Sequence, residues 1–133
     1  MLTADTSRPN AEIAAAWISW TERLDPGKPG NPSPSAEEEG DWGEQALLDL
    51  VIEDPLRALE IVFLIARSSG DEWLLSNLGA GPIESLLAED ATLLDGIALE
   101  LQTNPALGTA LASVWPLHMP DETRRALRRL VDN

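Results

Sequence analysis

Hydrophobic residues recur along much of this chain at intervals of three and four, which is the spacing of an amphipathic α-helix. Between residues 11 and 24, this spacing places Ile13, Trp17 and Trp20 on one face. Similar stripes follow in later segments, and none alternates apolar and polar residues for long enough to predict a β-strand. The pattern therefore predicts an all-α protein, a single compact bundle or short superhelix of about 7–8 helices. We expect residues 1–133 to form one helical domain.

Proline and the residues next to it mark the expected helix starts. Asp54-Pro55, Asn104-Pro105 and Pro120-Asp121 each combine a capping residue with a proline that the first helical turn tolerates. We therefore expect a helix to begin at each of these three dipeptides. Residues 25–40 contain four prolines and then the run Glu37-Glu38-Glu39, which predicts a flexible loop rich in proline, glycine and glutamate.

The segment from residue 78 to residue 115 carries the most information about packing. Glycine commonly follows the end of a helix and proline commonly opens one, so Gly79, Gly81 and Pro82 predict that one helix ends near Leu78 and the next begins at Pro82. Helical spacing then predicts a set of buried apolar residues in this segment and in the last helix, namely Ile83, Leu86, Leu87, Leu94, Ile97, Ala98, Leu101, Leu107, Leu111, Val114, Trp115, Leu127, Leu130 and Val131.

The same segment resembles the signature of a family of small bacterial proteins of unknown function. Ala80-Gly81-Pro82-Ile83-Glu84, followed by Leu86-Leu87, is similar to the AGPLE-x-LL core of that family. The rest of the signature is matched in spacing by Ile97, Leu101, Asn104-Pro105, Leu107, Leu111 and Val114-Trp115. This sequence has Ala98 and Gly108 where the family has a glutamate and an arginine. The resemblance implies a shared fold. A simple account of the two differences is that the charged residues pair with each other in the relatives; if they were catalytic there, this protein would be inactive.

The charge of the chain is strongly negative and unevenly distributed. The formal net charge is −14, and between Glu37 and Glu122 there are 18 acidic residues against only Arg57 and Arg67. Binding to nucleic acid or to an anionic membrane depends on Lys and Arg that displace counterions. We therefore expect neither nucleic acid nor a membrane as a partner, and the acidic surface favours a basic protein.

Four arginines near the end of the chain depart from this acidic character. Arg124, Arg125, Arg128 and Arg129 occupy one expected helix, where two pairs of them are one turn apart. Cations near a helix C-terminus interact favourably with the helix dipole and can bridge to acidic residues. The alternative interpretation is a docking site for phosphate or for an acidic protein.

Residues that could carry catalysis are few. His118 is the only histidine, there is no cysteine, and no phosphate-binding glycine loop, nucleophile elbow or zinc-protease motif is present. We therefore expect no catalytic residue, no cofactor and no metal site. The first ten residues lack the pattern of a signal peptide, and no apolar run approaches the roughly 18 residues of a membrane helix, so we expect a cytoplasmic protein.

These features favour a non-enzymatic, acidic interaction module. The most specific hypothesis is an immunity or inhibitor protein that blocks a basic partner such as a bacterial toxin, with acidic side chains in the partner's anion subsites and tryptophans as anchors. The candidate partner-binding residues are Asp41, Trp42, Glu44, Asp71, Glu72 and Trp73. Two alternatives stay open, namely an uncharacterised bacterial enzyme that uses carboxylates and His118, and a structural subunit that self-associates through Trp17 and Trp20.

Overall fold

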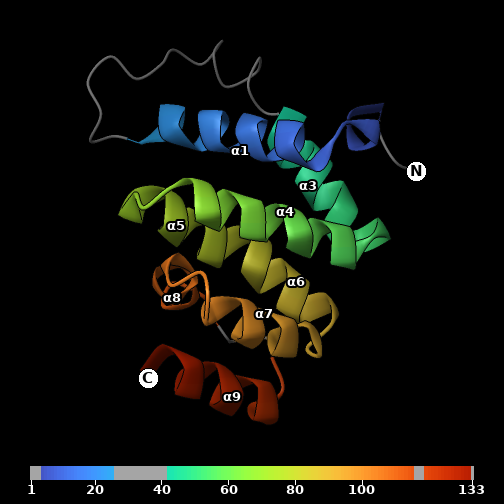
Figure 1. The fold of residues 1–133 in the computed structure, drawn as a ribbon. Coiled ribbons are helices and arrows are strands. Elements are labelled where there is room, and N and C mark those ends of the chain that lie inside the picture. The colour runs from blue at the N-terminus through green and yellow to red at the C-terminus, as the bar shows by residue number, and fades with distance from the viewer. Residues whose placement is uncertain (1–3, 26–41, 116–118, 133) are drawn as a thin grey trace. The chain divides into compact units, whose positions relative to one another are not determined.

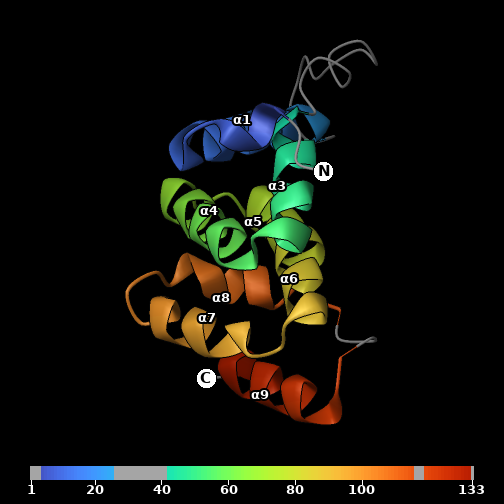
Figure 2. The same ribbon diagram turned by 90° about the vertical axis from the view of Figure 1, so that its right-hand side faces the viewer.

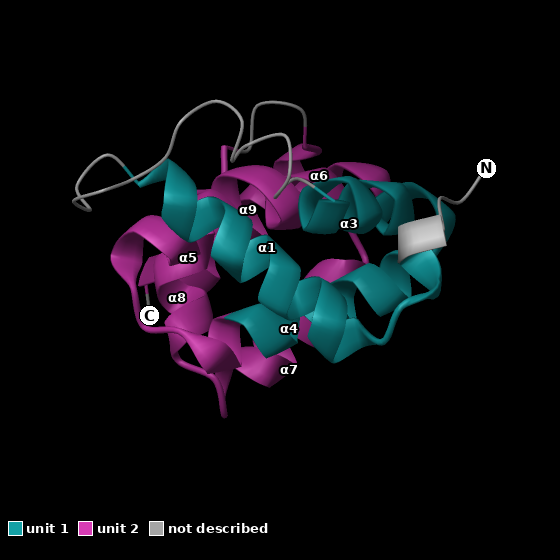
Figure 3. Ribbon diagram, turned by 90° about the horizontal axis from the view of Figure 1, so that it is seen from above, with its two compact units in different colours: residues 1–65 teal, residues 66–133 magenta. Residues whose placement is uncertain are grey.

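The computed structural model describes residues 4–25, 42–115 and 119–132 (Figure 1). Within these ranges all regular structure is helical and no strand occurs, so the predicted all-α class is confirmed. The chain divides into two compact units, residues 1–65 and 66–133 (Figure 3). The expected single domain stays a prediction, and each unit is described by itself. The predicted loop at 25–40, except for Asp25, and the candidate residues Asp41 and His118 lie outside the described ranges.

Part of the core of the first unit forms where the helix at residues 10–24 packs against the helix at residues 42–53. Ile13 and Trp17 from the first helix are buried together with Ala46, Leu47 and Leu50 from the second. Full burial of a leucine or isoleucine side chain stabilises a fold by about 1.5–3 kcal/mol. The elements of this unit are a 3-10 turn η1 (Ala4–Ser7), α1 (Asn10–Leu24), α3 (Trp42–Glu53) and most of α4 (Pro55–Ser68).

Gly43 allows α3 to approach α1 closely. A Cβ atom at Gly43 would lie 2.6 Å from the backbone nitrogen of Trp17 and 2.8 Å from the Cβ of Ala16. No side chain fits that space, so glycine is required here by packing rather than by a turn.

Arg57 ties the start of the chain to α4. Its Nε donates to Oδ1 of Asn10 at 2.7 Å, its Nη1 donates to the carbonyl of Thr6 at 2.5 Å, and its Nη2 donates to the carbonyl of Arg8 at 2.6 Å. The planar guanidinium presents several donors at fixed angles, which suits three acceptors on one segment. Arg57 thereby fixes η1 and the start of α1 against α4.

The second unit is built from short helices whose buried faces meet in one core. Leu74, Leu78, Ile83, Leu86 and Ile97 are each completely buried, as are Leu107 and Ala110. Figures 1 and 2 both show α9 beside α7 and α8. The elements of this unit are α5 (Glu72–Leu78), a π-helical turn η2 (Gly79–Ile83), α6 (Glu84–Glu89), α7 (Leu93–Leu101), α8 (Ala106–Leu111) and α9 (Asp121–Asp132).

The predicted helix break between Leu78 and Pro82 is wrong. Gly79 has right-handed helical angles, and the backbone N–H of Glu84 donates to the carbonyl of Gly79, five residues earlier. Proline lacks an N–H group and crowds the carbonyl four residues before it, and a π-helical turn widens the helix at such a point. The chain therefore stays helical from α5 through η2 into α6.

Gly79 serves close packing instead of ending a helix. A Cβ atom there would lie 1.7 Å from the carbonyl oxygen of Ala110 in α8. A Cβ atom at Gly81 would have no neighbour within 4 Å. The two glycines of this motif thus have different roles, which local sequence cannot distinguish.

Two residues expected in the core of this unit are exposed. Trp115 is 65% exposed because α8 ends at Leu111, so helical spacing no longer determines which side of the chain faces inward. Its backbone N–H donates to Oε1 of Glu84 at 2.8 Å. Val131 is 37% exposed, whereas Leu127, one turn earlier, is buried as expected. Most of the other expected core residues are buried, and Ala98, Leu101 and Leu130 are half-buried.

Asn104 holds the start of α8 to α7. It is 5% exposed, and its side-chain amide donates to Oε2 of Glu100 at 3.2 Å. The same oxygen of Glu100 pairs with Arg67 at 2.5 Å. The predicted helix at Asn104-Pro105 is therefore present, and the asparagine additionally links two helices.

Candidate interaction surface

Trp42 and Glu44 lie in the first turn of α3, and both already have contacts within their unit. The guanidinium carbon of Arg8 lies 4.7 Å from the ring centroid of Trp42, within the range of a cation–π contact. Arg8 also pairs with Glu12 at 2.9 Å. The Trp42 ring is half-buried, so a partner could contact it only beside Arg8.

Glu44 supports the fold of the first unit. Its Oε2 accepts a hydrogen bond of 2.7 Å from Nε1 of Trp17, which is only 1% exposed. A buried indole N–H needs an acceptor, and Glu44 provides one across the contact between α1 and α3. Because Trp17 belongs to the core, a surface for self-association in this region would have to rely on Trp20, which is half-buried.

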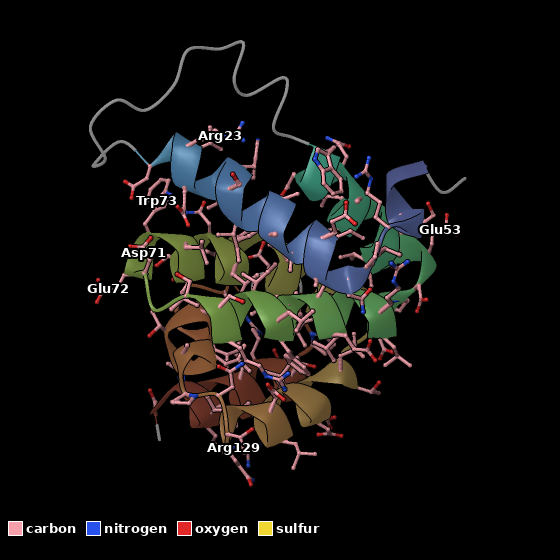
Figure 4. The ribbon with its side chains drawn as sticks, turned by 45° about the horizontal axis from the view of Figure 1, so that its top comes forward. Arg23, Glu53, Asp71, Glu72, Trp73 and Arg129 are labelled. Atoms are coloured by element: carbon pink, nitrogen blue, oxygen red, sulfur yellow. The ribbon has the colours of Figure 1, made fainter. Side chains whose placement is uncertain are left out.

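Asp71, Glu72 and Trp73 lie together at the start of α5 in the second unit (Figure 4). Oδ2 of Asp71 accepts a hydrogen bond of 3.1 Å from the backbone N–H of Leu74, so this carboxylate caps the helix. Glu72 is exposed and extends away from the helix, whereas Trp73 is half-buried. Glu72 is thus the residue of this group whose charge is most accessible to a partner.

The structure adds an apolar surface in the first unit that the sequence analysis missed. Leu48, Ile52 and Leu56 are 38%, 69% and 66% exposed, and we call these three residues the outer patch. Leu48 and Ile52 are one turn apart on α3, on the side opposite the buried stripe of Leu47, Leu50 and Val51. The sequence contains a signal for this surface, because residues 47–52 include more apolar side chains than one buried helix face can hold.

A single residue, Asp54, separates α3, which carries two residues of the outer patch, from α4, which carries Leu56. The backbone N–H of Asp54 donates to the carbonyl of Leu50 at 2.8 Å, and the carbonyl of Asp54 accepts from Ala58 at 3.0 Å. Asp49 and Glu53 directly follow patch residues in sequence, and Glu60 lies one helical turn after Leu56. Glu53 and Glu60 are exposed. Figure 4 shows Glu53 at the end of α3. The patch therefore combines apolar side chains with carboxylates at its edge.

The described residues contain no group of three or more His, Cys, Asp or Glu side chains arranged to hold a metal ion. In the same ranges, no helix combines the length and apolar character that a bilayer span needs.

Comparison with known proteins places the chain in a family. One family model matches residues 31–133, which is most of the sequence. The chain belongs to the family of unknown function DUF6869. The matched residues include the outer patch and the whole second unit, whereas α1 precedes them. No curated protein matches the chain, and no solved structure does.

Proposed function

We propose that this protein is a non-enzymatic interaction module that binds a basic protein partner through the outer patch. The observation that carries the proposal is the pair Ile52 and Leu56, each about two-thirds exposed beside acidic residues. The first unit has 13 acidic and 4 basic residues, a net charge of −9. Apolar side chains at the centre of an interface supply affinity, and charges at its edge select the partner and speed association.

The charge of the unit decides which class of partner is favoured. A second copy of the chain would bring two acidic edges together, and like charges at an interface cost several kcal/mol. Nucleic acids and anionic membranes are repelled for the same reason. A protein with a basic surface around an apolar contact complements both features of the patch.

A bacterial toxin with a cationic active site is the partner class we propose, which makes this protein an immunity protein of the bacterial cytoplasm. Carboxylates such as Glu53 would occupy the subsites that bind the toxin's anionic substrate. Trp42, Glu72 and Trp73 remain candidate contacts, whereas Glu44 and Asp71 also hold the fold. We also propose that the family is bacterial and that residues Ala80–Glu84 belong to its characteristic motif.

Capture of the tagged full-length chain from its native host at low and moderate salt tests the proposal. The matched variants are Glu53→Lys, at the edge of the patch, and Glu89→Lys, an exposed position in the second unit. Both change the net charge equally. A lysine at the last residue of α3 also suits the helix dipole, so Glu53→Lys should fold.

We expect one stoichiometric basic protein with the wild type at low salt. That protein should be lost as salt rises, lost with Glu53→Lys and retained with Glu89→Lys. Absence of any protein partner at either salt, or equal loss with both variants, would overturn the proposed function.

A further inference from the structure

A cavity of about 560 Å³ lies between α8 and α9 in the second unit. Its apolar wall includes Leu111 and Val114 from the end of α8 and Leu127 and Val131 from α9. Pockets for small ligands usually have volumes of about 300–1,000 Å³ and are mostly apolar with a few polar groups. The volume of this cavity lies within that range, and its lining is divided equally between apolar and charged residues.

One face of α9 supplies the polar side of the cavity. Arg124, Arg125 and Arg128 line it, and Arg128 lies four residues after Arg124 and three after Arg125, which places it on the same side of the helix as both. Arg129 is equally exposed but does not line the cavity. Three of the four terminal arginines therefore converge on one space beside apolar side chains.

The positive charge in this cavity is only partly compensated. Arg124 pairs with Asp121, whereas Arg125 and Arg128 have no ion pair among the described residues. The acidic lining residues, Asp121 and Asp132, are the first and last residues of α9, roughly 16 Å apart along the helix axis. The lining residues nevertheless carry a net charge of +1, from three arginines and two aspartates, although the protein as a whole carries −14.

We propose that this cavity binds a small amphipathic anion, a carboxylate or phosphate attached to an apolar body. Arg125 and Arg128 would hold the anionic group through charge-assisted hydrogen bonds. The apolar body would pack against Leu111, Val114 and Val131. Val131 is exposed although it is apolar, which such a ligand would explain by covering it.

A small molecule fits these observations better than a macromolecule does. The volume is that of a ligand pocket, and the net charge of the protein repels nucleic acid. The site is independent of the proposed function, since it lies in the other unit and selects ligands of the opposite charge. A variant that loses ligand binding in the cavity should therefore keep partner binding at the outer patch, and a variant that loses partner binding should keep ligand binding.

Isothermal titration calorimetry of the full chain tests this site with four probes. Decanoate and decyl phosphate carry both an anionic group and an apolar body and distinguish the two anions. Decanol lacks the charge, and inorganic phosphate lacks the apolar body. We expect saturable one-to-one binding of decanoate, decyl phosphate or both, and much weaker heats with decanol and inorganic phosphate.

Substitutions of arginines inside and outside the cavity test whether the ligand binds there. Arg125→Gln and Arg128→Gln, each as a single variant, should weaken binding by about tenfold or more, because charge-assisted hydrogen bonds are lost. Arg129→Gln removes the same charge outside the cavity and should leave the affinity within about twofold. All three arginines are exposed, and circular dichroism should show the same helix content in each variant. Absence of saturable binding, equal affinity for decanol, or an equal effect of Arg129→Gln would overturn the proposal.

Discussion

Gly79 and Gly81 lie in the same helical turn, but only Gly79 is pressed against another backbone. We expect Gly79→Ala to reduce the free energy of unfolding by about 1–3 kcal/mol, because the added Cβ would overlap the carbonyl of Ala110. Gly81→Ala has open space and should be neutral or stabilise the protein by up to about 1 kcal/mol. Chemical denaturation of both variants measures the difference. Equal stability of the two variants would contradict the contact between η2 and α8.

Gly108 lies inside α8 and, unlike Gly79, has room for a side chain. A Cβ atom there would lie 3.8 Å from Cδ1 of Leu101, which is an ordinary van der Waals contact. Because alanine favours helix more than glycine does, Gly108→Ala should raise the free energy of unfolding by about 0.5–1 kcal/mol. A thermal melt next to the wild type measures the effect. A lower melting temperature would mean that α8 needs the glycine for a reason that the packing does not show.

Three residues show which structural roles can be predicted from the local sequence and which cannot. The capping role of Asp71 depends only on the next few residues, so the local sequence contains a signal for it, although Asp71 was predicted as a partner contact. The role of Gly79 could not be predicted, because its neighbour Ala110 is 31 residues away in sequence. Helical spacing predicted that Trp115 lies in the core. That spacing applies only while the helix continues, and α8 ends at Leu111, so Trp115 is exposed.

At the level of elements, the attachment of the N-terminal segment depends on Arg57. Arg57→Ala removes three hydrogen bonds, so amide protons in η1 and the first turn of α1 should exchange faster with solvent. The free energy of unfolding should fall by about 1.5–3 kcal/mol, the range for hydrogen bonds to charged groups. Arg129→Ala is the control, since that side chain is exposed and has no ion pair among the described residues. Unchanged exchange in residues 4–12 of Arg57→Ala would contradict the proposed attachment.

The bounds of α4 could be predicted closely from the sequence because Asp54-Pro55 gives a local start signal and the apolar stripe runs without interruption to its end. The continuity of α5, η2 and α6 could not, because glycine and proline ordinarily interrupt helices and the π-helical turn depends on packing. The outer patch was missed for a related reason. Leu48 and Ile52 belong to an apolar-rich helix in which only one face is buried.

For the molecule as a whole, the acidic charge is concentrated in the first unit. Residues 1–65 have a net charge of −9 and residues 66–133 a net charge of −5, since four arginines offset part of the acidity of the second unit. Association with a basic partner should therefore slow steeply as salt rises from about 0.01 M to about 1 M, where the Debye length falls from about 30 Å to about 3 Å. Stopped-flow association rates across this range check the prediction. A rate independent of salt would remove the electrostatic part of the proposed function.

Sequence composition was sufficient to predict an acidic helical protein, but it placed the candidate contacts beside tryptophans. Of those candidates, Glu44 and Asp71 have structural roles, and Asp41 lies outside the described residues. The apolar centre of the proposed interface became visible only with the exposed fractions of Ile52 and Leu56. Burial depends on which helices meet, and that information is not local in sequence.

The affinity of the purified partner for matched apolar variants tests the central claim most directly. Ile52→Ser alters the most exposed residue of the outer patch, and Leu99→Ser alters a leucine in the second unit that is equally exposed, at 69%. We predict that the first variant raises the Kd by about tenfold or more, because central apolar contacts carry most of an interface's energy. Leu99→Ser should bind like the wild type. Equal Kd values for all three proteins, or a loss confined to Leu99→Ser, would contradict the assignment of the interface to the outer patch.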